Sequence, residues 1–132
     1  MKVYGQEKVK VSMIRNVLNK CKYSLDGLKF CFMNETSFLL EALGAIVIII
    51  FGMIFDIDFV EWVISFGSLM LIAITELINT AIEATVDLVT EEYHPLAKVA
   101  KDCGSAATGI MTILALLANF IIFAPYIIGL FV

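Results

Sequence analysis

The stretch "WVISFGSLMLIAITELINTAIEATVDL", residues 62–88, joins a long apolar run to a set of regularly spaced polar side chains. No charged residue interrupts it before Glu76. A helix rises 1.5 Å per residue, so about 20 apolar residues cross the ~30 Å hydrocarbon core of a bilayer. The stretch therefore predicts a membrane-spanning helix that carries acids towards one end.

The rest of the chain shows the same character. Of its 132 residues, 61% are hydrophobic, which is too high for a soluble domain that must cover itself with polar groups. Two further apolar runs occupy residues 38–55 and 104–132, and the second carries no charge. We predict a single all-α integral membrane domain over residues 1–132. Its expected transmembrane helices cover residues 36–55, 59–88 and 99–131.

The basic residues predict the orientation of these helices. Seven of the nine lysines and arginines precede the first span, and Lys98 and Lys101 lie in the loop 88–103. The turn "DID", residues 56–58, is acidic. Because cytoplasmic loops retain the basic residues, the N-terminus and the loop 88–103 should be cytoplasmic, and the C-terminus outside. We therefore expect a multi-pass protein of the cytoplasmic membrane.

Residues 8–33 predict an amphipathic helix on the membrane surface. Apolar side chains such as Ile14, Leu18 and Leu25 recur at steps of three and four, with basic residues between them. The alternative is an ordinary cytosolic helix that packs on a partner.

Four polar residues form one stripe on the second span. Glu76, Asn79, Glu83 and Asp87 are spaced by three, four and four residues, so they fall within roughly 60° of one another around a helix. An acid at the depth of Glu76 costs at least ~2.5–3.5 kcal/mol on insertion scales, so it needs a partner or a purpose. A structural pairing with a hydroxyl or amide of a neighbouring helix is one explanation. Three acids in register favour a functional site.

The stripe suits two kinds of chemistry. A desolvated carboxylate such as Glu76 can act as a general base on a hydroxyl. Acids nearer the water, such as Glu83 and Glu35, can hold Mg²⁺, a hard ion that prefers oxygen ligands. Lys101 offers a charge for phosphate, and His94 is either a base-contacting or an interfacial side chain. Together they indicate phosphoryl transfer at the inner membrane face, although no Walker A or Gly-rich kinase loop identifies the donor.

Four motifs resemble the small prokaryotic diacylglycerol kinase family, which includes the undecaprenol kinases. They are "NETSF" (34–38), "ELINTAIEATVDL" (76–88), "EEYHPLAK" (91–98) and "AKDCGSAA" (100–107). The likeness extends from about Tyr23 to Ala107. It implies a homotrimer of subunits with one amphipathic surface helix and three transmembrane helices. It further implies active sites shared between subunits, which transfer the ATP γ-phosphate to a lipid hydroxyl with Mg²⁺. We expect no nucleic-acid partner.

The resemblance also implies roles for individual residues. Glu76 matches the general base, which also contacts the lipid, and Glu35 and Glu83 match acids that hold the metal and contact ATP. Arg15 lies one position from the family's N-terminal arginine, whose place Asn16 takes, and is a tentative contact to ATP. The other matches to ATP-binding positions are Tyr23, Glu92, Tyr93, His94, Lys101 and Asp102. Ser105 and Glu41 match lipid-binding positions, with a structural role for Glu41 equally open, and Asn79, Asp87 and Asn34 match supporting ones.

The motifs do not all indicate the same acceptor lipid. "KDCGSAA" and "NETSF" resemble the diacylglycerol branch, whereas "EYHPLAK" and "IIFAPYI" (121–127) resemble the undecaprenol branch. We favour diacylglycerol, converted to phosphatidic acid, because Ser105 lies nearer the chemistry than Pro95. Undecaprenol is the alternative. Two hypotheses of other classes are a small proton-coupled exporter that uses Glu76, which would leave Glu83 and Lys101 without a role, and a non-catalytic membrane subunit.

Overall fold

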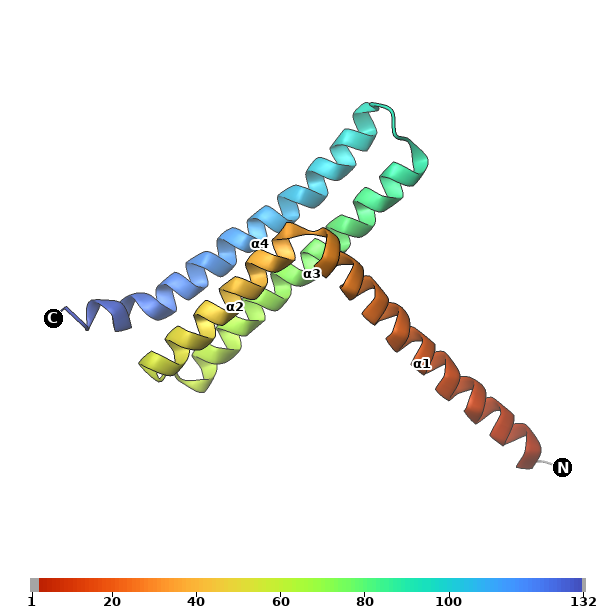
Figure 1. Cartoon of the computed structure of the whole chain (residues 1–132), viewed down its shortest axis with the longest axis horizontal. Helices are drawn as coiled ribbons and strands as arrows, with labels where there is room; N and C mark the ends of the chain where they lie inside the picture. The colour runs from red at the N-terminus through yellow and green to blue at the C-terminus, as the bar shows by residue number, and fades with distance from the viewer. Residues whose placement is uncertain (1–2, 132) are drawn as a thin grey trace. The chain divides into compact units, whose positions relative to one another are not determined.

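The chain is all-helical in the part that the computed structural model describes, residues 3–131, with side chains from residue 13 onwards. Its helices are α1 (Val3–Asn34), α2 (Thr36–Phe55), α3 (Phe59–Val89) and α4 (Pro95–Ile128) (Figure 1). By length and composition, α2, α3 and α4 can each cross a membrane. The chain divides into two units, residues 1–34 and 35–132.

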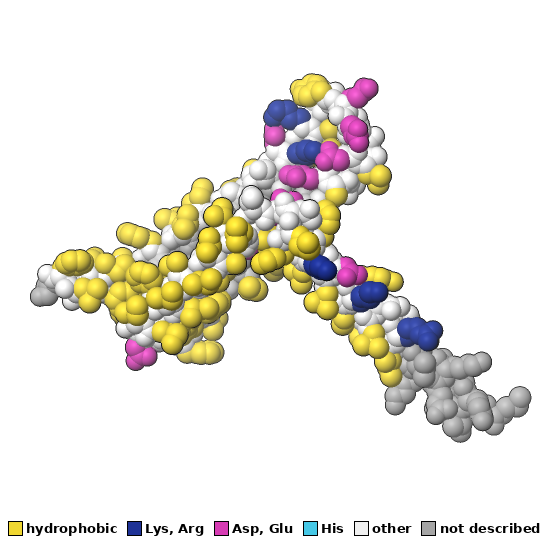
Figure 2. Space-filling view, in the orientation of Figure 1, with side chains coloured by type: hydrophobic (Ala, Val, Ile, Leu, Met, Phe, Trp, Pro, Cys, Tyr) yellow, Lys and Arg dark blue, Asp and Glu magenta, His cyan; other side chains and the backbone are white. Residues whose placement is uncertain are grey.

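The first unit is the single helix α1. It is longer than the predicted segment 8–33, and the side chains of residues 8–12 lie outside the described part. Its described basic side chains follow one another along the helix in Figure 2. Ile14, Leu18 and Leu25 are exposed, as an unpartnered apolar face requires. The position of this helix on a membrane surface stays a prediction.

A tight turn joins α2 to α3 in the second unit. Asp56 adopts a left-handed conformation (φ 49°), and its N–H donates to the carbonyl oxygen of Gly52, which ends α2. Asp58 then caps α3: its Oδ1 accepts from the N–H of Glu61, and its own N–H donates to Glu61 Oε2, both at 2.9 Å. This reciprocal capping fixes where α3 begins, at the end of the bundle opposite to the polar stripe.

The loop between α3 and α4 is short, so the two helices run antiparallel side by side (Figure 1). The helix α4 begins at Pro95, four residues before the predicted residue 99, and ends at Ile128, before the predicted residue 131. Proline is favourable in the first turn, where its missing N–H costs nothing, and His94 caps the helix. The earlier start adds a turn of helix beside the polar end of α3.

The apolar core lies towards the turn 56–58. Ile48 of α2, Leu69 and Ile72 of α3, and Ala115 and Phe123 of α4 are buried against one another. The helix α2 has 20 residues and α3 has 31, so the α3–α4 hairpin extends beyond α2 by about 16 Å at 1.5 Å per residue. Figure 2 shows that charged side chains of both signs gather on this extension, whereas the surface between it and a few acidic side chains at the other end of the bundle is mostly apolar.

Candidate active site

The predicted polar stripe runs along α3 from the bundle to the tip of the hairpin. Glu76 is buried, with 9% of its surface exposed. Asn79 and Glu83 are half-buried, and Asp87 is exposed. The four residues therefore sample a gradient from a dry environment to water. Such a gradient suits a site that brings a membrane-embedded group to a soluble one.

Two members of the stripe are hydrogen-bonded to each other. The Asn79 Nδ2 donates to Glu83 Oε1 over 3.0 Å, one helical turn apart. This bond fixes the orientation of the Glu83 carboxylate and leaves its Oε2 to meet a ligand.

A second acid lies near Glu76 at the contact between α2 and α3. Glu41 is half-buried on α2, and its Oε1 has no hydrogen-bond partner among the described residues. Its carboxyl group is within electrostatic reach of Glu76, so a negative charge on one group disfavours a negative charge on the other. A buried acceptor without a donor is costly. The Glu41 Oε1 lacks a hydrogen-bond donor, and a hydroxyl group of a bound molecule is a donor of the required kind.

A polar cavity of about 390 Å³ occupies the tip of the hairpin. Lys101 of α4 reaches across it to Asp87 of α3, with 2.6 Å between Nζ and Oδ1. Lys98 pairs with Asp102 within α4. The cavity is also lined by the predicted loop residues Glu92, Tyr93 and His94, together with Val86, Thr90, Glu91 and Ala97. Cations, acids and an aromatic ring therefore meet at one place.

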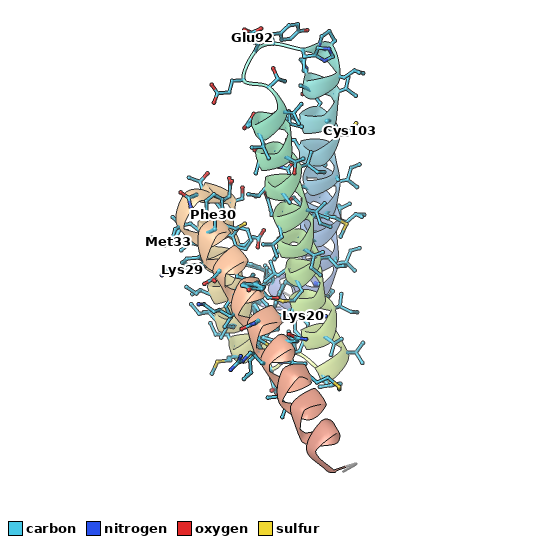
Figure 3. The ribbon with its side chains drawn as sticks, turned by 90° about the vertical axis from the view of Figure 1, so that its right-hand side faces the viewer. Lys20, Lys29, Phe30, Met33, Glu92 and Cys103 are labelled. Carbon is cyan, nitrogen blue, oxygen red and sulfur yellow. The ribbon has the colours of Figure 1, made fainter. Side chains whose placement is uncertain are left out.

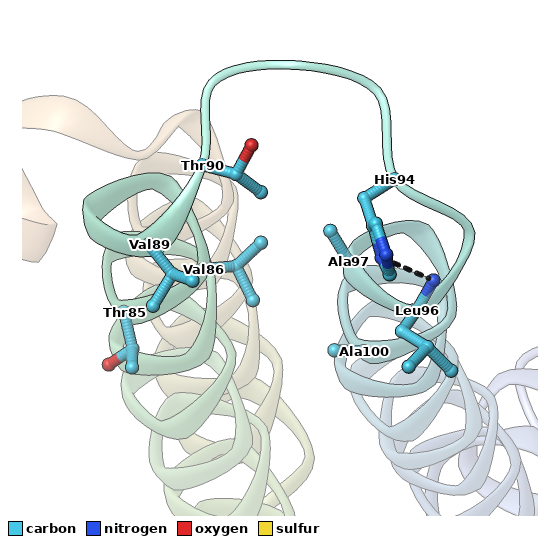
Figure 4. Close-up of a pocket in the computed structure, with 8 residues that line it drawn as sticks. All are labelled: Thr85, Val86, Val89, Thr90, His94, Leu96, Ala97 and Ala100. Carbon is cyan, nitrogen blue, oxygen red and sulfur yellow. Dashed lines mark hydrogen bonds between the residues drawn. The ribbon is translucent and has the colours of Figure 1, made fainter.

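A more apolar cavity of about 430 Å³ lies between the same two helices (Figure 4). Val86 and Val89 of α3 line it opposite Ala97 and Ala100 of α4. The His94 Nδ1 accepts from the Leu96 N–H over 3.2 Å, so the neutral ring carries its proton on Nε2. The two cavities share Val86, Thr90, His94 and Ala97. The hairpin tip thus offers apolar walls beside a charged compartment.

The remaining predicted residues lie elsewhere. Glu35 is the residue before the first turn of α2 and is half-buried. Ser105 is exposed on α4 beside Gly104. Tyr23 and Arg15 are exposed on α1, and the Asn34 Nδ2 donates to the Phe30 carbonyl oxygen at its end. These three belong to the first unit.

The oxygen donors of the site fit a divalent cation in their chemistry. Among the described side chains, no three His, Cys, Asp or Glu residues lie close enough together to hold a metal ion. Mg²⁺ commonly takes only one or two protein carboxylates and completes its shell with water and phosphate oxygens. The oriented carboxylate of Glu83 has the chemistry for such a role, and the metal-binding roles of Glu83 and Glu35 stay predictions.

Lys98 and Thr90 are two of the cavity-lining residues to which the sequence alone gives no place in the site. Lys98 was assigned no role there, although only two lysines occur between the second and third spans. Thr90 accepts a hydrogen bond from the Glu92 N–H over 3.1 Å and so shapes the loop. Figure 3 shows Glu92 on this loop, at the far end of the hairpin, with Cys103 further along α4. A threonine hydroxyl that bonds the backbone two residues on is a turn signal, and Thr90 directly before the loop could have been interpreted as one.

Comparison with known proteins covers most of the chain. A family model described as prokaryotic diacylglycerol kinase matches residues 22–123. Diacylglycerol kinase of Escherichia coli K12 is 37% identical over 101 residues, which is 76% of this chain and 83% of that protein. Diacylglycerol kinase of Pseudomonas aeruginosa is 42% identical over 94 residues, 71% of this chain and 76% of its own. Undecaprenol kinase of Bacillus subtilis is 37% identical over 91 residues, covering 69% and 74% respectively.

Proposed function

The chain belongs to the prokaryotic diacylglycerol kinase family, and from this premise we propose that it transfers the ATP γ-phosphate to the hydroxyl of diacylglycerol, giving phosphatidic acid. The observation that carries the proposal is the continuous stripe on α3. It connects a buried acid, Glu76, to a charged cavity at the hairpin tip, where Lys101 lies. A lipid hydroxyl and a soluble triphosphate can meet along this line.

Glu76 is the proposed general base. Its burial keeps water from competing with the lipid hydroxyl, and its carboxylate can accept the hydroxyl proton as the oxygen attacks the γ-phosphorus. The bond from the γ-phosphorus to the β–γ bridging oxygen breaks in the same transfer, and ADP leaves. Glu41 adds a second acceptor beside it, which can orient the same hydroxyl. Ser105 is proposed to contact the lipid headgroup.

The nucleotide is proposed to occupy the tip of the hairpin. When ATP binds, the Lys101 ammonium group leaves the Asp87 carboxylate and binds phosphate oxygens instead. One charge-assisted hydrogen bond thus replaces another. Glu92, Tyr93, His94 and Asp102 surround the same cavity or border it. Glu83 and Glu35 are proposed to hold Mg²⁺, which when bound offsets the negative charge of the triphosphate.

We propose a homotrimer on the cytoplasmic membrane, with active sites shared between subunits. This arrangement is the one that the resemblance to the prokaryotic diacylglycerol kinase family implies. The helix α1 is proposed to lie on the cytoplasmic surface and to supply Tyr23 and Arg15 as contacts to ATP, with Asn34 in a supporting role.

The acceptor is tested by one kinase assay on two lipids. Purified protein in mixed micelles with Mg-ATP is expected to phosphorylate diacylglycerol faster than undecaprenol. The alternative, undecaprenol kinase, is favoured by the Bacillus subtilis relative and predicts the reverse order. Activity on neither lipid would contradict the proposal. It would favour a proton-coupled exporter or a non-catalytic subunit, neither of which needs Mg-ATP.

A further inference from the structure

The helices α3 and α4 approach each other closely where Asn79 faces Gly104. A Cβ added to Gly104 would overlap the Asn79 Oδ1. Among the described glycines, Gly52 is the other position at which an added Cβ would overlap a neighbour, there the Trp62 ring. Gly109, on the same helix, has open space around it. The Asn79 carboxamide therefore fits against α4 because residue 104 is a glycine and has no side chain.

The carboxamide has one orientation that the site accepts. Its Nδ2 donates to Glu83 Oε1, whereas its Oδ1 is buried against Gly104 without a hydrogen-bond partner in the described part of the chain. The flipped amide would point Oδ1 at the carboxylate, so that two acceptors would face each other. The unsatisfied oxygen is costly. In this orientation the Asn79 Nδ2 holds the Glu83 carboxylate in place.

We infer that Gly104 is a positioning residue for the metal-binding carboxylate of Glu83, and that it acts through the Asn79 carboxamide. The inference rests on the proposed function, in which Glu83 holds Mg²⁺. A methyl group at residue 104 pushes Asn79 Oδ1 away, which turns Nδ2 off the carboxylate and leaves Glu83 free to rotate. Loss of such a supporting hydrogen bond typically weakens metal binding by about 10–100-fold.

The test compares Gly104→Ala with its matched control Gly109→Ala. Both add one methyl to α4, but only the first meets a neighbour within 4 Å. Binding of Mn²⁺ to the purified full-length protein is measured by electron paramagnetic resonance, with a non-hydrolysable ATP analogue present. We expect Gly104→Ala to weaken Mn²⁺ binding by about tenfold or more. The Mg²⁺ concentration for half-maximal kinase activity should rise by a similar factor, whereas Gly109→Ala should match the wild type in both.

A double-variant experiment separates positioning from misfolding. Asn79→Ala removes the carboxamide without adding bulk, so it should reproduce the metal defect with an unchanged melting temperature. Adding Gly104→Ala to it should cause no further loss, because both changes act through the same contact. Wild-type Mn²⁺ affinity in either Gly104→Ala or Asn79→Ala overturns the inference. Failure of the proposed function looks different: the wild-type protein itself would need no divalent metal or would phosphorylate no lipid.

Discussion

Glu76 is the residue on which the proposed chemistry most directly depends. Replacement by glutamine keeps its shape but removes its ability to accept a proton. We expect Glu76→Gln to lower kcat by about 10²–10⁴-fold, the usual contribution of a general base. The melting temperature should not fall, since a neutral amide is less costly than an acid at this depth. The check is turnover on diacylglycerol beside thermal unfolding.

A suitable control for that variant is Asp56→Asn. Asp56 is exposed at the turn that joins α2 to α3, and asparagine tolerates its left-handed backbone. It should keep both activity and stability. Substantial kinase activity in Glu76→Gln would show that another group takes the proton.

Lys101 and Lys98 line the same cavity, but only Lys101 connects the two helices. Lys101→Ala should raise the KM for ATP about tenfold or more, because a charge-assisted bond to phosphate is lost. Lys98→Ala breaks an exposed pair within α4, which is worth little, so its effect should be clearly smaller. ATP titrations at saturating lipid distinguish them. Equal KM values for the two variants would argue against a special role for Lys101.

Sequence identifies the site residues that follow from the periodicity of one helix, but not those that depend on how two helices pack against each other. The stripe from Glu76 to Asp87 follows from helical periodicity, which is local and visible in one segment. The approach of Gly104 to Asn79 depends on the register between two packed helices, which periodicity does not determine. The cavity roles of Lys98 and Thr90 depend on the same register. Which acids bind the same metal ion depends further on how subunits pack together, and helical periodicity within one chain does not determine that packing.

At the scale of whole elements, one hydrogen bond joins the start of α3 to the end of α4. The Tyr126 hydroxyl donates to Glu61 Oε2 over 2.7 Å, and that same carboxylate completes the cap of α3. Tyr126→Phe removes only the hydroxyl. A hydrogen bond to a charged group contributes about 1.5–3 kcal/mol, so the free energy of unfolding should fall by about 1.5 kcal/mol. Thermal or detergent unfolding measures the loss.

The specificity of that effect is tested with a second variant. Glu61→Gln weakens the same bond and the cap, and the combined variant should lose less than the sum of the two single losses. Kinase activity below the melting temperature should be preserved in Tyr126→Phe, because this bond lies at the opposite end of the bundle from the stripe. Additive losses would show that Tyr126 and Glu61 act independently.

The existence of the helices was more predictable than their ends and contacts. Long apolar runs identify α2, α3 and α4 as candidate spans, because the hydrocarbon core demands length and few charges. The helix α4 begins four residues before the predicted span 99–131, because Pro95 is favourable in the first turn of a helix and His94 caps it. The bonds from Asn119 to Ser68 and from Tyr126 to Glu61 connect α4 to α3 in a register that no single segment reveals.

At the scale of the whole molecule, the orientation in the membrane can be tested by labelling. The basic residues predict the loop 88–103 inside and the turn 56–58 outside. In a background without Cys21, Cys31 and Cys103, a membrane-impermeant maleimide should label Asp56→Cys in intact spheroplasts. Glu91→Cys should react only after the membrane is permeabilised. Both positions are exposed, so accessibility within the protein is matched. The opposite labelling pattern would invert the proposed topology.

The proposed homotrimer with shared active sites makes a different demand on the whole molecule: no single chain needs to supply a complete site. Glu35 starts α2, whereas Glu76 and Glu83 lie on α3, and the described part of the chain does not gather three metal ligands. Glu35→Gln, Glu76→Gln and Glu83→Gln should each be inactive alone. When two variants are co-expressed in equal amounts, about a quarter of the sites formed between neighbouring subunits combine two intact halves. At least one pairing should therefore recover about a quarter of wild-type activity. If no pairing recovers any activity, each chain supplies all three acids to its own site, which contradicts the proposed sharing of sites between subunits.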